Sequence, residues 1–236
     1  MIPIMRDVPI NNPEVLELLN SFLWFPNNIK EVEKNVLLTG RNLTGKKSTY
    51  KYWTGEHYLK EVKDLGKEHN GFPVSSKMFN LKTDQANWNH NNNDNFVSSV
   101  NKIADVYNKA NNDLSSYFNA RHNALCVLYP PGGWISWHNN ANASAYNLIF
   151  TWSETGDGFF KYVDGRTKEI VTLKDKPGWQ CKAGYFGSYR ESEENLVYHS
   201  AGTECYRFTV SFIFAGGKHE MSKEFQEMVI EDILMD

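Results

Sequence analysis

The sequence predicts a mainly β protein with flanking helices, whose strands close into a jelly roll or a related barrel. From Asn123 onward, short runs of β-branched and aromatic residues alternate with Gly, Pro, Asn and Asp, as strands and turns do. Before and after this region, apolar residues recur at helical spacing. The 236 residues are 41% hydrophobic and 14% aromatic, which is enough for one substantial core.

We expect a single domain, 1–236, with three parts. Residues 1–122 form a supporting region of helices and loops, residues 123–215 form the β core, and residues 216–236 form a C-terminal helix. Within the first part we predict a helix capped by Asn12-Pro13, a helix near 56–69, and a longer helix. The longer helix is indicated by an apolar face made of Phe96, Val100, Ile103, Tyr107, Leu114 and Phe118.

Eight strands are predicted in the β core. Asp164-Gly165 is expected to turn a hairpin, because Asp-Gly readily adopts tight turn conformations. The predicted strands are NALCVLY, GWISWH, AYNLIFTW, GFFKYVD, KEIVTL, GWQCKAGYFG, NLVYHS and CYRFTVSFIF.

Composition narrows the class of protein. The net charge of -3 gives no global basic field, which disfavours non-specific binding of nucleic acid. We expect a cytoplasmic protein that does not enter a membrane, because the N-terminus has neither a basic head nor an unbroken apolar run. The odd, scattered Cys126, Cys181 and Cys205 are expected to be buried free thiols.

Candidate metal ligands lie on three of the predicted strands. His138 ends the second, His199 lies in the seventh, and Arg207 lies in the eighth. Two imidazoles and a carboxylate on one face of an octahedron hold non-haem Fe(II) while leaving positions open. A barrel-facing arginine in an apolar run is costly unless an anion meets it, and its fork suits a carboxylate.

The stretch from Tyr129 to His138, with His199 and the run Arg207-Phe-Thr-Val-Ser, resembles the Fe(II)/2-oxoglutarate-dependent oxygenases, particularly the prolyl-hydroxylase branch. That branch has a tyrosine nine residues before the first metal histidine, then an H-x-D motif. A distal histidine follows, with a basic residue eight or nine positions later. The runs YNLIFTWSETGDGFF and YHSAG also resemble oxygenase-like proteins of bacterial viruses.

The resemblance implies a double-stranded β-helix core, of the jelly-roll and cupin kind, in which His138 and His199 bind iron. It implies that Arg207 pairs with the C5 carboxylate of 2-oxoglutarate and that Tyr129 hydrogen-bonds the same group. Thr209 follows Arg207 on the same strand face and is a candidate for the cosubstrate pocket. Tyr146 is another candidate, if it faces inward together with Leu148 and Phe150.

The implied enzyme is a dioxygenase (hydroxylase) that uses Fe(II), 2-oxoglutarate as a small-molecule cosubstrate, and O2. Oxidative decarboxylation of the cosubstrate to succinate and CO2 would accompany hydroxylation of a C–H bond. An amino-acid side chain, free or within a protein, is slightly favoured as the primary substrate. A nucleotide or a small metabolite fits nearly as well.

Asn140 occupies the position where the H-x-D motif has its aspartate. In one interpretation Asn140 ligates the metal through its amide oxygen, or leaves a water there, and oxygenation proceeds. In a second, the open position takes a halide, as in the related 2-oxoglutarate-dependent halogenases. In a third, Glu154 or Asp157 supplies the carboxylate. A non-catalytic jelly-roll binding module that has lost its iron with its aspartate is a further alternative.

Overall fold

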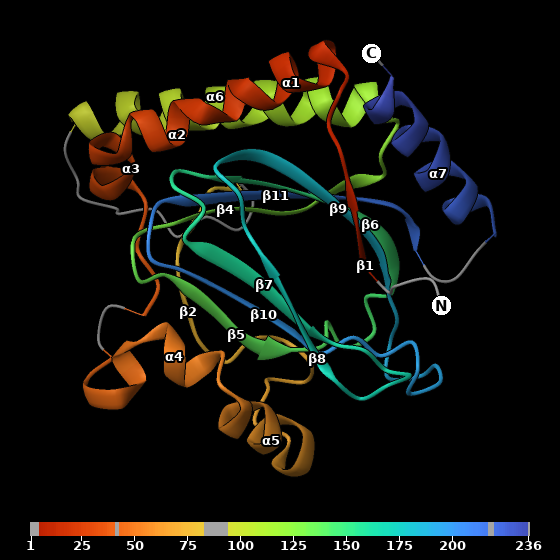
Figure 1. Cartoon of the computed structure of the whole chain (residues 1–236). Helices are drawn as coiled ribbons and strands as arrows, with labels where there is room; N and C mark the ends of the chain where they lie inside the picture. The colour runs from red at the N-terminus through yellow and green to blue at the C-terminus, as the bar shows by residue number, and fades with distance from the viewer. Residues whose placement is uncertain (1–4, 41–42, 83–93, 217–219, 236) are drawn as a thin grey trace.

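The computed structural model describes residues 5–40, 43–82, 94–216 and 220–235, without the side chains of 94–99, 215, 216 and 220. Two antiparallel sheets face one another in this part of the chain, and helices cover the outer face of each (Figure 1). Helices α1, α2 and α6 lie across one sheet, whereas α4 and α5 lie beside the other.

The bounds of the elements show where the chain alternates between helix and strand. The helices are α1 (Pro13–Asn20), η1 (Ser21–Leu23), α2 (Trp24–Asn27), α3 (Ile29–Asn35), η2 (Gly45–Ser48), α4 (Tyr50–Trp53), α5 (Glu56–Leu65), α6 (Asp94–Tyr117) and α7 (Glu220–Leu234). The strands are β1 (Met5–Val8), β2 (Ser76–Lys77), β3 (Phe79–Asn80), β4 (His122–Tyr129), β5 (Trp134–His138), β6 (Ala145–Ser153), β7 (Gly158–Val163), β8 (Ile170–Lys174), β9 (Gly178–Phe186), β10 (His199–Thr203) and β11 (Arg207–Gly216).

The strand order is that of a double-stranded β-helix. One sheet has the order β1-β9-β6-β11-β4-β3, and the other has the order β2-β5-β10-β7-β8. From β4 to β11 the chain changes sheet at every connection except the β7–β8 hairpin. The core is therefore two interleaved sheets wound as one, which confirms the predicted fold class.

Both faces of the larger sheet are covered, one by helices and the other by the smaller sheet. Phe150 and Phe212 belong to the apolar cluster that packs against the helices. The ring of Phe150 stacks on that of Phe118, the residue after α6, with 5.4 Å between the ring centroids. Ile149 and Val127 point the opposite way and belong to the cluster inside the barrel. This division decides which residues of each strand can reach a site between the sheets.

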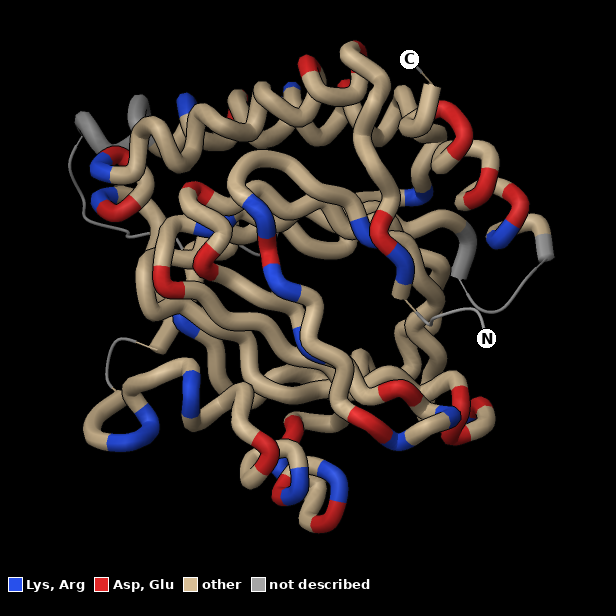
Figure 2. Tube along the Cα trace, viewed as in Figure 1, with Lys and Arg blue, Asp and Glu red and all other residues tan. Residues whose placement is uncertain are grey.

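The smaller sheet is covered by α4 and α5, which pack on Trp134 and Trp137 of β5. Burying these two indoles fixes β5 from outside, so that its inward residues can serve the barrel interior. Figure 2 shows that charged residues gather on the helices and outer loops, while the central strands carry few. Within the described residues, no helix has both the length and the apolar character needed to cross a membrane.

The predicted elements are present, with shifted ends. Asn12 caps α1 by accepting hydrogen bonds from the backbone N–H groups of Glu14 and Val15. The helix predicted over 56–69 ends at Leu65, because Gly66 adopts the left-handed conformation that closes a helix. The run NLVYHS is a strand only from His199 onward, so the residues before it form a loop.

Candidate active site

Two histidine rings lie side by side inside one end of the barrel. His138 at the end of β5 is the register partner of His199 at the start of β10, and their ring centroids are 4.1 Å apart. Both rings are buried, and Phe186 contacts the ring of His199 at 4.8 Å between centroids. The structure thus brings together the two predicted metal ligands in an apolar setting.

A β-bulge in β5 helps to orient His138. The register pairs His199 with His138 and Ala201 with Ile135, so two residues of β5 lie opposite one residue of β10. In a regular strand, residues three apart would point to opposite faces. The extra residue allows Ile135, which belongs to the inner cluster, and His138 to face the same interior.

Hydrogen bonds to backbone carbonyls fix the tautomer of each ring. Nδ1 of His138 lies 2.8 Å from the Ser136 carbonyl oxygen, and Nδ1 of His199 lies 2.9 Å from the Val197 carbonyl oxygen. Because a carbonyl only accepts, each Nδ1 carries the proton and each neutral ring keeps a lone pair on Nε2, the form that ligates metals.

The rings are also held in the neutral state. Burial lowers the pKa of His138 to about 4, although the carbonyl groups of Ser136 and His199 oppose the shift. Burial, and then the neighbouring His138, hold the pKa of His199 well below its usual range. Neither ring therefore has to lose a proton at neutral pH before it can bind a cation.

Asn140 lies in a tight turn directly after β5. Its φ of 64° is in the left-handed region, which asparagine tolerates better than most residues. The Gly71 carbonyl accepts hydrogen bonds from the N–H groups of Asn139 and Asn140, at 3.1 and 2.8 Å. Within the described part of the chain, the side-chain amide of Asn140 makes no hydrogen bond.

We expect replacement of Gly71 by alanine to disturb this turn. A Cβ at position 71 would lie 2.3 Å from the backbone nitrogen of Ala141, and the φ of 87° disfavours any side chain. The clash and the strain together should lower the free energy of unfolding by about 2 kcal/mol or more. Urea denaturation of Gly71→Ala measures this loss.

Gly66→Ala is the matched control, because Gly66 also has a positive φ but has open space around its Cβ position. We expect it to cost only the conformational part, about 1 kcal/mol. Equal losses in the two variants would contradict a specific packing of Gly71 against the turn.

The described residues do not supply a carboxylate for the two imidazoles. Among the described residues, no group of three or more His, Cys, Asp or Glu side chains is placed to hold a metal ion. The interpretation in which Glu154 or Asp157 fills this role is wrong. Glu154 accepts a hydrogen bond from the Tyr206 N–H, and Asp157 accepts one from the Thr155 hydroxyl, in the β6–β7 turn at the Arg207 end of the barrel.

Arg207 lies fully buried at the other end of the same interior. Its Nε donates to Asp175 at 2.7 Å, and its Nη1 donates to the Thr209 hydroxyl at 2.7 Å. Nη2 reaches the Thr151 hydroxyl at 3.4 Å. Tyr129 is the register partner of Arg207, and the guanidinium carbon lies 5.4 Å from its ring centroid.

Burial raises the pKa of Tyr129 to about 12, so this phenol stays protonated and can donate a hydrogen bond. For Arg207, burial acts to lower the pKa, but Asp175 and Tyr129 outweigh it and the pKa is raised. The guanidinium therefore remains charged inside the barrel. Tyr129, Arg207 and Thr209, three residues predicted to bind the cosubstrate, are in contact or in register with one another.

Tyr146 does not join them, and the prediction that it lines this pocket is wrong. Leu148 and Phe150 point to the helices rather than into the barrel, and Tyr146 shares their face of β6. Its ring packs against Tyr185 on that outer face, at 4.7 Å between centroids. The inward residues of β6 are the odd-numbered ones, including Thr151.

Sequence reasoning missed Asp175, Lys182 and Thr151. Asp175 continues the inward face of Val171 and Leu173 beyond β8, and its side chain is fully buried. Lys182 of β9 is also buried, and its Nζ lies 3.9 Å from Asp175 Oδ1 and 3.0 Å from Gln180 Oε1. One carboxylate therefore lies between two buried cations.

The histidine pair and this charged cluster are connected through the interior. On β10 and β7, His199 pairs with Tyr162 and Thr203 pairs with Gly158. A Cβ atom added at Gly158 would contact Asp175, Thr203 and Arg207. Thr203 therefore lies at the same depth of the barrel as the charged cluster. The four steps along the strand from His199 to Thr203 span about 13 Å at a rise of ~3.3 Å per residue.

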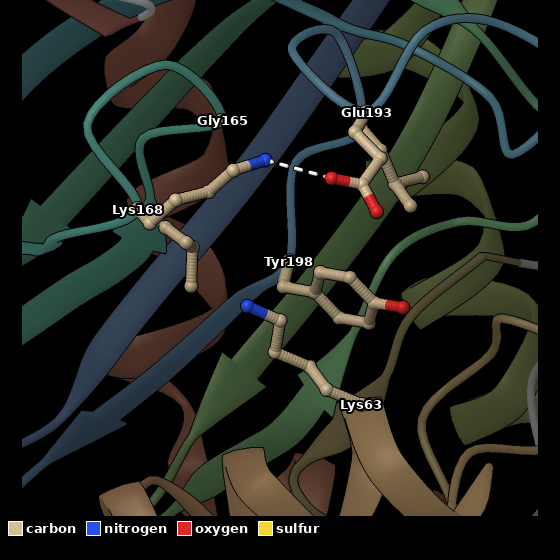
Figure 3. A pocket seen from close by; sticks show the side chains of 7 residues that line it. Lys63, Gly165, Lys168, Glu193 and Tyr198 are labelled. Atoms are coloured by element: carbon tan, nitrogen blue, oxygen red, sulfur yellow. Dashed lines mark hydrogen bonds and ion pairs between the residues drawn. The ribbon is translucent and has the colours of Figure 1, made fainter.

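A separate pocket of about 180 Å³ opens on the outside of the smaller sheet. Figure 3 shows Lys63 and Tyr198 on one side of it and the Lys168–Glu193 ion pair on the other. None of the predicted site residues lines this pocket. Tyr198 borders it although the next residue, His199, faces the barrel interior.

No family model and no curated protein matches the sequence. Among solved structures, a prolyl-4-hydroxylase from Pseudomonas putida is 10% identical with a TM-score of 0.40, covering 91% of this chain and 94% of that chain. A full-length Neurospora crassa protein in complex with alpha-KG is 11% identical with a TM-score of 0.35, covering 90% of this chain and 75% of that chain.

A viral collagen prolyl hydroxylase from Paramecium Bursaria Chlorella virus-1, in a 2OG complex, is 12% identical with a TM-score of 0.31, covering 60% of this chain and 79% of that chain. These values describe a distant likeness to each structure. The double-stranded β-helix itself is established by the strand order of this chain.

Proposed function

We propose that this protein is an Fe(II)/2-oxoglutarate-dependent dioxygenase that hydroxylates a C–H bond. The proposal depends on one observation: two neutral imidazoles with Nε2 lone pairs and a buried, charged Arg207 share one barrel interior. Imidazole nitrogen and amide oxygen are suitable ligands for Fe(II). His138 and His199 would hold the metal, with Asn140 as a third, neutral ligand.

The role of the protein side chains is binding, orientation and protection. With iron and 2-oxoglutarate bound, the cofactors and O2 supply the oxidising chemistry. Arg207, Tyr129 and Thr209 would hold the distal carboxylate of the cosubstrate and so aim its 2-oxo acid end toward the histidines. Phe160 and Phe186, which contact the ring of His199, keep the metal end apolar.

The finer assignment is to the prolyl-hydroxylase branch. It is based on the order in which Tyr129, His138, His199 and Arg207 occur along the sequence. An amino-acid side chain, free or within a protein, is the proposed primary substrate. We also propose a phage origin, because the runs YNLIFTWSETGDGFF and YHSAG resemble oxygenase-like proteins of bacterial viruses.

The test is anaerobic addition of Fe(II) and 2-oxoglutarate to the purified protein. We expect the weak visible charge-transfer band of a 2-oxo acid chelated to iron, and its loss in a His138→Ala/His199→Ala variant that lacks both rings. Absence of the band in the wild-type protein at saturating concentrations of both ligands would overturn the proposal.

A non-catalytic binding module derived from such an enzyme is the second candidate. Two observations favour it, namely that Arg207 already has a protein carboxylate as partner and that no carboxylate of the described residues joins the two imidazoles. This candidate predicts no metal-dependent consumption of 2-oxoglutarate, even when the protein is fully folded.

A further inference from the structure

The buried cluster at the Arg207 end of the barrel has more positive than negative charge. The side chains of Arg207 and Lys182 are each 2% exposed, and that of Asp175 is 0% exposed. Two cations and one carboxylate leave one excess positive charge. Asp7, the register partner of Lys182 on β1, is exposed and makes no ion pair with it in the described part of the chain.

The hydrogen bonds within the cluster are also incomplete. Asp175 Oδ2 accepts from Arg207, but Asp175 Oδ1 is buried without a hydrogen-bond partner in the described structure. Lys182 donates to Gln180 Oε1, and its 3.9 Å distance to Asp175 Oδ1 is too long for a hydrogen bond. An ammonium group has three donors, and within the described residues Lys182 uses one of them, toward Gln180.

The head group of Lys182 is directed toward Arg207. Lys182 itself pairs with Ile149, two residues closer to the histidine end than Gln180, which pairs with Thr151. Its Nζ nevertheless reaches back to Gln180 and toward Asp175, the partner of Arg207. Two cationic groups therefore approach the same carboxylate, and the hydroxyls of Thr151 and Thr209 lie beside the Arg207 guanidinium.

A buried ammonium group that shares Asp175 with a guanidinium is only partly compensated, and the cost of burying it is reduced if an anion enters the cluster. Burial lowers the pKa of Lys182, with Asp175 acting in the opposite direction, as expected for an ammonium group whose counter-charge is shared. A single carboxylate from a ligand would neutralise the net charge of Arg207, Lys182 and Asp175. It would also accept hydrogen bonds from the remaining N–H groups of Lys182.

We propose that Lys182 is a second binding group for the distal carboxylate of a 2-oxo diacid, acting beside Arg207, with Asp175 positioning both cations. This inference rests on the proposed function and extends it, because it makes the preference for a dicarboxylic 2-oxo acid depend on a lysine of β9. In a purely structural role, Lys182 would serve only to balance Asp175.

The experiment compares two 2-oxo acids by anaerobic calorimetry in the presence of Mn2+, which replaces iron without redox chemistry. One probe is 2-oxoglutarate, and the other is 2-oxopentanoate, which lacks the distal carboxylate. We expect Lys182→Met to bind 2-oxoglutarate about tenfold more weakly than the wild type, as for loss of one charge-assisted hydrogen bond. Its affinity for 2-oxopentanoate should be unchanged, and Lys182→Arg should retain most of the preference.

Lys174→Met is the matched control, since Lys174 is exposed on β8 beside Asp175 and carries the same charge. It should leave both affinities unchanged. If Lys182→Met keeps the wild-type ratio of affinities, or weakens both acids equally, the assignment of Lys182 is wrong while the proposed function stands. If the wild type itself does not prefer 2-oxoglutarate, the proposed function fails.

Discussion

Replacement of Arg207 by methionine should lower the free energy of unfolding by about 3–5 kcal/mol and abolish binding of 2-oxoglutarate. Methionine fills much of the arginine volume but leaves Asp175 buried without its closest cation. Breaking one side of a buried ion pair is costly because the remaining charge stays desolvated. Urea denaturation measures the first effect, and calorimetry with Mn2+ measures the second.

The two effects can be separated with the double variant Arg207→Met/Asp175→Asn. Its stability should recover most of the loss, because no buried carboxylate remains and Lys182, whose pKa burial already lowers, can release its proton. Binding should not recover, because the guanidinium is absent. Recovery of 2-oxoglutarate binding in the double variant would show that Arg207 does not hold the cosubstrate.

The pair formed by Arg166 and Asp164 is a suitable comparison for the stability measurement. It is also an arginine–aspartate pair, but the side chain of Arg166 is 29% exposed in the β7–β8 turn. We expect Arg166→Met to have a much smaller effect, since the buried Asp164 keeps hydrogen bonds from the backbone N–H groups of Arg166 and Thr167. A similar loss in both variants would mean that the loss of the only close donor that the described residues offer Asp175 does not govern the effect at Arg207.

The strands and three of the site residues could be predicted because they depend on local sequence. Strand runs, the Asp164-Gly165 turn and the positions of His138, His199 and Arg207 within them are visible in the residue order. The strand order then determines that these positions face one interior, since β5 and β10 are neighbours and β11 lies across the barrel.

The direction of side chains on β6 and β9 could not be predicted from hydrophobicity. Both faces of the larger sheet are buried, so the alternation that separates core from solvent in a one-sided sheet is absent. The sequence pattern therefore allows Tyr146 to face inward, and it equally allows Lys182 to face solvent, although neither does. Only the packing of Leu148 and Phe150 against helical residues distinguishes the two faces.

Asp175 and the Gly71 contact were missed for a different reason. Asp175 stands in the turn sequence LKDKPG, where aspartate is common, and nothing local indicates that it points inward. Gly71 lies more than 60 residues before the turn that its carbonyl holds. Such long-range contacts depend on the assembled fold, so a pattern within one segment does not reveal them.

Asn140→Asp should raise the affinity for divalent metal by about tenfold or more. It adds a negative charge at the position that the two imidazoles leave without a carboxylate, and hard oxygen ligands of this kind favour Fe(II) and Mn2+. The backbone should accept the change, since aspartate resembles asparagine in tolerating the left-handed conformation at a φ of 64°. Titration of the apoprotein with Mn2+ under anaerobic conditions measures the affinity.

Asn142→Asp is the control, because Asn142 is exposed in the same turn and gains the same charge. If both variants gain equally, the effect is a general attraction and Asn140 does not face the metal. If only Asn140→Asp gains, and the wild type already forms the iron and 2-oxoglutarate complex, a neutral third ligand is sufficient for binding. If the complex forms only in Asn140→Asp, the asparagine has removed an ancestral metal site, and the wild-type protein is the non-catalytic module.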